Sequence, residues 1–177
     1  KNLMDTPIAE AMLNFVEEIG PGVWGLEAQS IFQQLEQQYG ELRAALEWFI
    51  AQGRADKSLR FAIALAPFWM ARKRLDEGVA WFEQVLALSG GDHAQRGRAL
   101  FEAGMLAFWQ GDDARAATLH HQALGTGRQI NHPTVIALAL GGLARIALRT
   151  DLEQAQQLCR QALAITEGTD DRAGRSS

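Results

Sequence analysis

Four histidines and one cysteine are the side chains of this sequence best suited to metal ligation or nucleophilic chemistry. His120 and His121 are adjacent within a helical pattern, so they point about 100° apart, which is poor geometry for one metal ion. His120 and Cys159 occupy equivalent positions on the apolar stripes of their segments. We therefore expect His120 to be a core histidine with a local partner, and Cys159 to be a small buried hydrophobic residue. A ligand contact by His120 and a reactive thiol at Cys159 are the alternatives.

Acidic pairs and glycine motifs provide no further catalytic candidate. The paired acids at 17–18, 112–113 and 170–171 fall at helix starts, ends or tails, where acids in a first turn complement the helix dipole. The sequence contains neither a GxxxxGK[ST] loop nor a GxGxxG between a strand and a helix. Gly141-Gly142 lies inside a helical pattern, where it is expected to permit close packing. We predict no catalytic, cofactor-binding or metal-ligating residues, no cofactor, and no enzymatic activity.

The composition is typical of a folded helical protein. Hydrophobic residues make up 47% and charged residues 21%, and the formal net charge of −4 favours no general attraction to nucleic acid. The densest basic cluster, 72–74, is followed by Asp76 and Glu77. A single cysteine excludes an internal disulfide and suits a reducing compartment. The longest uncharged apolar run, 61–71, is too short to span a bilayer and contains Pro67, which should kink a helix. We expect a cytoplasmic segment cut from a longer protein.

An internal repeat organises the chain. The segments 75–86, 113–124 and 152–163 carry apolar or small residues at matching offsets, which trace one stripe of an amphipathic helix. A more apolar segment precedes each of them, at 59–71, 98–109 and 135–148. Short polar turns join each pair, and Gly90-Gly91 and residues 125–132 join one pair to the next. In the turn 110–112, Gly111 suits a left-handed helix end and Asp112 can cap the following helix. The sequence thus predicts three antiparallel helical hairpins, with most of the five tryptophans in the core.

Small residues at regular positions resemble a known repeat. Gly104, Ala107, the tripeptide 110–112, Ala116 and Ala123 resemble the small-residue signature of the tetratricopeptide repeat. The repeats are longer than the standard of about 34 residues, which is similar to the long-repeat variety of large bacterial signal-transduction regulators. Residues 35–48 resemble the "LE…NLRAALEW" stretch of those regulators, which lies between an ATPase module and the repeats. A LuxR-type helix-turn-helix domain often follows the repeats in that group.

The resemblance implies an all-α, tetratricopeptide-like, right-handed solenoid of antiparallel helix pairs. Residues 1–53 would form a helical lead-in, 54–91 the first repeat, 92–131 the second and 132–168 the third. Residues 169–177 echo the start of the second repeat and are expected to begin a truncated fourth. The exposed end of such a truncated array predicts self-association.

Aromatic residues at helical spacing mark the predicted binding surface. Phe101, Met105 and Phe108 recur on one helix face, with Trp109 beside them, and the matching positions of tetratricopeptide arrays face a concave groove. An aromatic groove flanked by guanidinium groups suits a peptide, a helix or a small polar ligand such as a sugar. Alternatively, neighbouring repeats cover these side chains. The candidate contacts are Arg98, Phe101, Met105, Phe108, Trp109, Arg145 and Arg149.

The function that the resemblance implies is that of a sensor and coupling segment. Such segments occur in the bacterial ATPase-linked, LuxR-type and maltose-activator-like transcription regulators that this sequence resembles. Its partners would be proteins, neighbouring domains of the parent chain or a small-molecule inducer, with no direct contact to nucleic acid or membrane. A stand-alone scaffold that binds protein partners without a small-molecule effector is the alternative.

Overall fold

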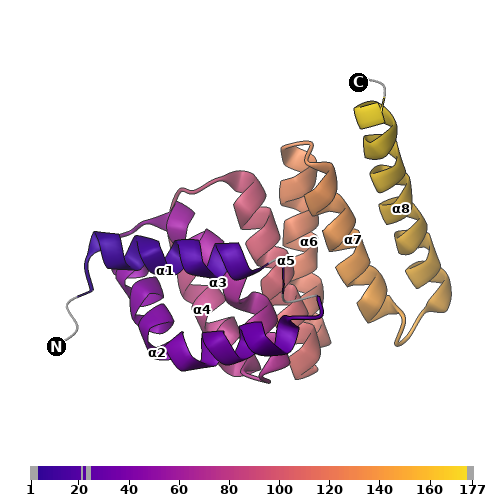
Figure 1. The fold of residues 1–177 in the computed structure, drawn as a ribbon. Helices are drawn as coiled ribbons and strands as arrows, with labels where there is room; N and C mark the ends of the chain where they lie inside the picture. The colour runs from indigo at the N-terminus through magenta and orange to yellow at the C-terminus, as the bar shows by residue number, and fades with distance from the viewer. Residues whose placement is uncertain (1–3, 21, 23–24, 175–177) are drawn as a thin grey trace. The chain divides into compact units, whose positions relative to one another are not determined.

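The computed structural model describes residues 4–20, 22 and 25–174, without the side chains of 169–174. The described residues form eight helices and no strand, so the expectation of an all-α protein is confirmed (Figure 1). The chain divides into two compact units, residues 1–91 and 92–177. The first contains α1 (Thr6–Ile19), α2 (Ala28–Ala51), α3 (Ala55–Ala71) and α4 (Leu75–Ala87); the second contains α5 (His93–Gln110), α6 (Asp113–Gln129), α7 (Pro133–Ala147) and α8 (Leu152–Gly174).

The first unit is built around α3, which packs against α1, α2 and α4. Because α3 is apolar on nearly all sides, it buries Phe61, Phe68 and Trp69 completely. The helix continues through Pro67. The buried indole Nε1 of Trp69 donates a hydrogen bond of 2.7 Å to the Tyr39 hydroxyl on α2. This bond satisfies the polar end of an otherwise apolar core.

The basic cluster at 72–74 is engaged within the first unit. Glu36 forms ion pairs with both Arg72 and Arg74. The Arg74 guanidinium also lies 4.5 Å from the centre of the Tyr39 ring and pairs with Glu77. These acids and rings partner the two guanidinium groups on the surface of their own unit.

In the second unit, α7 packs against α5, α6 and α8. The turn between α5 and α6 follows the prediction: Gly111 adopts the left-handed conformation, with φ of 86°, and the Asp112 side chain accepts a hydrogen bond from the Arg115 backbone N–H. His132 caps α7 in the same way by accepting from the Val135 N–H, with Pro133 in the first turn. The α7 and α8 helices lie side by side across a short turn (Figure 1).

Several boundaries differ from the prediction. Residues 125–129 belong to α6 rather than to a connection. A side chain at Gly127 would meet Val135 and Ile136 at 3.0 Å, so its absence permits close packing of α6 on α7. Helix α8 continues to Gly174, so residues 169–174 extend it and do not begin a separate helix, while 175–177 lie outside the described residues. Trp69 and Trp81 are core residues, whereas Trp109 is 54% exposed. Trp24 lies outside the described residues.

No helix in the described part of the chain is long and apolar enough to cross a membrane.

Gly111 and Gly125 form a matched pair for testing this turn. A Cβ added at either position would have no neighbouring group within 4 Å, but Gly111 has a positive φ and Gly125 is helical. We expect Gly111→Ala to lower the free energy of unfolding by about 1 kcal/mol. Gly125→Ala should raise it by up to about 1 kcal/mol, because alanine is the better helix former. Urea unfolding monitored by circular dichroism measures both, and equal effects of the two substitutions would contradict the assignment.

Candidate functional site

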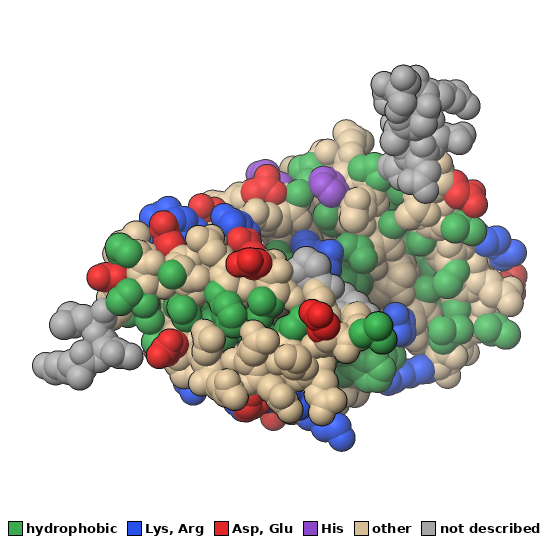
Figure 2. All heavy atoms as spheres, in the orientation of Figure 1, with side chains coloured by type: hydrophobic (Ala, Val, Ile, Leu, Met, Phe, Trp, Pro, Cys, Tyr) green, Lys and Arg blue, Asp and Glu red, His purple; other side chains and the backbone are tan. Residues whose placement is uncertain are grey.

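Helices α5, α7 and α8 line an open groove of about 520 Å³ in the second unit. Most of its lining is apolar, and hydrophobic side chains gather over α7 and α8 in the space-filling view (Figure 2). The lining residues are Phe101 and Met105 of α5; Pro133, Thr134, Ala137, Leu138, Gly141, Gly142 and Arg145 of α7; and Cys159, Ala162, Leu163 and Thr166 of α8.

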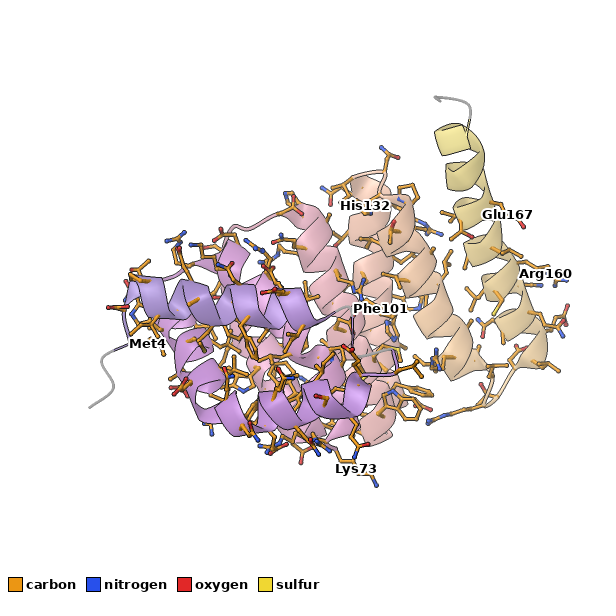
Figure 3. The ribbon with its side chains drawn as sticks, in the orientation of Figure 1. Met4, Lys73, Phe101, His132, Arg160 and Glu167 are labelled. Carbon is orange, nitrogen blue, oxygen red and sulfur yellow. The ribbon has the colours of Figure 1, made fainter. Side chains whose placement is uncertain are left out.

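Helical periodicity on α7 creates the floor of the groove. The lining positions recur every four residues along one stripe, from Pro133 to Arg145. Two positions in the middle, Ala137 and Gly141, carry little or no side chain, and a Cβ added at Gly141 would have nothing within 4 Å. On α8, the charged residues Arg160 and Glu167 point away from α7 (Figure 3). The small side chains at Ala137 and Gly141 therefore leave space above α7, and the side of α8 that faces this space is apolar.

Arg145 is the charged residue of the groove lining, and no described acidic residue pairs with it. Its guanidinium is exposed to solvent. Two other arginines of this unit are engaged: Arg98 Nε lies 2.7 Å from Glu102 Oε1, and Arg149 Nη1 lies 2.8 Å from Asp113 Oδ1. Arg145 is thus a cation at the edge of an apolar surface without a partner among the described acids.

The seven predicted contacts do not all lie on one surface. Phe101, Met105 and Arg145 line the groove. At the C-terminal end of α5, the Arg149 guanidinium lies 4.1 Å from the Phe108 ring centre, and Trp109 packs edge-on against Phe108. Arg98 lies 5.8 Å from the Phe101 ring centre while bonded to Glu102. These separate clusters replace the single aromatic surface expected from sequence.

His120 of α6 is completely buried beside the groove-lining residues. Its ring lies 5.5 Å from the Phe101 ring centre and fits between α5 and α7, where Gly104 and Gly142 leave room for it. A methyl group at Gly142 would lie 2.5 Å from His120 Cε1, and one at Gly104 would lie 2.6 Å from the same atom. The core position was predicted correctly, but the expected local partner is not found: neither ring nitrogen has a hydrogen-bond partner among the described residues.

Burial keeps the His120 ring neutral. Loss of hydration, together with the nearby charges of His121 and Arg145, lowers the pKa of His120 to about 4. A second buried polar group, the Glu102 carboxyl, has its pKa raised by burial, an effect that Arg98 opposes. Glu102 has the hydrogen-bond partner that His120 lacks.

Cys159 corrects another expectation. The sequence pattern predicts a buried position, but the thiol is exposed and lines the groove. The equivalent positions Phe82 and His120 are buried because neighbouring helices cover them. Among the described helices none covers that side of α8, so the same stripe position is open.

The described residues contain no group of three or more His, Cys, Asp or Glu side chains that could hold a metal ion.

The two adjacent glycines, Gly141 and Gly142, have different surroundings. Gly142 packs against His120, as predicted, while Gly141 faces open space. Sequence reasoning did not identify the contribution of α8 to the groove, nor that of the small α7 residues. The sequence signal for this groove was the recurrence of small residues, Ala137 and Gly141, four positions apart on the stripe that ends at Arg145.

Comparison with known proteins finds relatives that are named as transcription regulators. The chain is 32% identical over 124 residues to proteins named "Putative HTH-type transcriptional regulator" in Mycobacterium bovis and in two strains of Mycobacterium tuberculosis. The match covers 63% of this chain and 14% of each relative, so the chain spans a small part of the curated relatives that it matches. No family model matches the chain.

Adjacent glycines on α7 test the packing around His120. Gly142→Ala should lower the free energy of unfolding by about 1–3 kcal/mol, because the new methyl group overlaps the buried ring. Gly141→Ala adds the same group one residue away in open space and should be neutral or stabilising by up to about 1 kcal/mol. Urea midpoints at constant m-value measure the difference. A Gly142→Ala variant as stable as Gly141→Ala would contradict the tight fit.

The pKa of His120 predicts a pH dependence of stability. The folded-state pKa of about 4 lies below the ordinary 6.5, so the unfolded chain binds a proton first as the pH falls. The stability contributed by the neutral ring is complete above pH 6.5 and declines between pH 6.5 and 4 by about 1.4 kcal/mol per pH unit. His120→Leu should flatten this part of the curve, whereas His93→Gln, at an exposed position, should not. Parallel curves for the wild type and His120→Leu would refute the assignment.

Proposed function

We propose that this chain is the sensor and coupling segment of a larger helix-turn-helix transcription regulator, with the groove of the second unit as its binding site. The groove carries the proposal, because it combines an apolar lining with one guanidinium that has no acidic partner among the described residues. Small-molecule sites commonly have this composition: mostly hydrophobic walls with a few polar groups that orient the ligand. The names of the mycobacterial relatives support the regulatory context.

The finer assignment rests on the resemblance of the sequence to ATPase-linked, LuxR-type regulators. In this proposal the helical pairs α3–α4, α5–α6 and α7–α8 are tetratricopeptide-like repeats of a solenoid. The packing of each pair and the contact of α7 with α5 and α6 support that organisation. The segment acts in the cytoplasm, is not catalytic, and passes a binding signal to neighbouring domains of its parent chain.

The proposed binding signal passes through the helix contacts of the second unit. A ligand in the groove touches α5, α7 and α8 together, and α7 also packs on α6. If two packings of these helices differ in their affinity for the ligand, binding shifts the equilibrium between them. The stand-alone scaffold remains the competing function, since the same groove would suit a helical segment of a partner protein.

Ligand-dependent thermal stabilisation tests the proposal. The chain is melted in the presence of a fractionated bacterial small-molecule extract, and at least one fraction should raise the melting temperature, because a ligand that binds only the folded state stabilises it. Ala137→Trp, which fills the groove, should abolish the shift. Ala114→Trp, at an exposed position of α6 outside the groove, should retain it. Shifts that survive Ala137→Trp would place binding elsewhere, and the absence of any shift would favour the scaffold.

A further inference from the structure

We propose that the ligand of the α5–α7–α8 groove is a small amphipathic carboxylate, whose apolar body lies along the helices and whose carboxylate binds Arg145. This inference rests on the proposed ligand-binding function and names the chemical class of the ligand. The sequence suggested a peptide, a helix or a sugar instead. An amphipathic carboxylate fits the observed lining, which is mostly apolar with one guanidinium.

The apolar lining determines the body of the ligand. Phe101 and Met105 on α5, Leu138 on α7 and Leu163 on α8 present hydrocarbon or ring surface to the groove. A sugar would bring several hydroxyl groups against this surface, and each hydroxyl that loses water without gaining a hydrogen bond carries a cost. An alkyl or alicyclic body instead gains from leaving water. The volume of about 520 Å³ lies within the usual range for small-molecule sites.

The polar side chains determine the orientation. Arg145 lies at the C-terminal end of the α7 stripe, about 18 Å along the helix from Pro133. Because α7 and α8 form a hairpin, Thr134 near the start of α7 and Thr166 near the end of α8 belong to the opposite end of the groove. Thus one end carries a cation, and the other carries the Thr134 hydroxyl and the Thr166 side chain, whose hydroxyl donates a hydrogen bond to the Leu163 backbone oxygen. Apolar surface lies between the two ends.

The charge of the ligand follows from the state of Arg145. Arg98 forms an ion pair with Glu102, and Arg149 forms one with Asp113. No described acidic residue pairs with Arg145. A guanidinium binds a carboxylate through two parallel hydrogen bonds, which a hydroxyl or an ammonium group cannot reproduce. The neighbouring His120 is buried, has no hydrogen-bond partner among the described residues, and is a neutral imidazole that supplies no negative charge. A monoanion is therefore the complementary ligand.

Isothermal titration with three probes of one apolar body tests the ligand class: octanoate, octanol and octylammonium. Octanoate should bind saturably and more weakly as NaCl is added, while octylammonium and maltose should give no measurable binding. Amide chemical shifts in a ¹H–¹⁵N spectrum should change at Thr134, Gly141 and Gly142. Octanol should bind about tenfold or more weakly than octanoate, because it lacks the charge.

Two arginine variants provide the matched comparison. Arg145→Gln should weaken octanoate binding about tenfold or more and remove its salt dependence, bringing it close to octanol. Arg149→Gln removes a guanidinium of the same unit that lies outside the groove lining, and octanoate binding should stay within about twofold. Circular dichroism verifies that both variants fold.

Several outcomes would overturn the inference. Equal binding of octanoate and octanol, or octanoate binding that is unchanged in Arg145→Gln, would exclude carboxylate recognition. Binding of an acidic amphipathic peptide, or a concentration-dependent dimer that Ala137→Trp abolishes, with no octanoate binding, would assign the groove to a helix or a second copy. If octanoate fails while extract-induced stabilisation still depends on Ala137, the proposed function stands and only the ligand class is wrong. If both fail, both are wrong.

Discussion

The insertion of the His120 ring between α5 and α7 is the packing constraint on which the second unit depends. Two helices can receive a ring from a third at this depth because Gly104 and Gly142 have no side chains at the contact. Neither ring nitrogen has a hydrogen-bond partner among the described residues, and burial keeps the imidazole neutral inside this apolar contact. The same contact brings α5 beside α7, and it thereby places Phe101 and Met105 on one surface with Arg145.

Ion pairs and ring contacts engage several arginines that lie outside the groove. In the first unit, Glu36 engages Arg72 and Arg74, and aromatic rings cover part of their charge. In the second unit, Arg149 combines an ion pair with a ring contact on Phe108. Such pairs at a surface contribute little to stability, but they do satisfy the charges that form them. The Arg145 guanidinium lines the groove and has neither kind of contact among the described residues, and this combination carries the inference about the ligand.

Helix α7 is the element through which ligand binding would affect the rest of the second unit. This helix supplies the longest stripe of the groove lining, and it packs against α5, α6 and α8. A ligand against α7 would therefore act on a helix that has neighbours on several sides, where small shifts change many contacts at once. An effector site in a coupling segment requires this property, whereas a passive scaffold requires only an accessible surface.

The amino-acid sequence by itself determined the helices, because amphipathic periodicity depends on local spacing. It predicted the paired segments, the left-handed Gly111, the capping Asp112 and the burial of His120. It did not place Gly127 inside α6, since glycine in a connection and glycine at a helix contact look the same in sequence. Three of the predicted contacts meet in the groove, while Phe108, Trp109 and Arg149 gather elsewhere.

Only the tertiary structure decided which of the predicted faces are covered. His120 and Cys159 share one stripe position, yet one is buried between helices and the other is exposed in the groove. Adjacent Gly141 and Gly142 likewise face open space and a buried ring. Periodicity identifies the face of a helix that is apolar, but burial and ion pairing depend on residues far away in the chain, and their positions are set by packing.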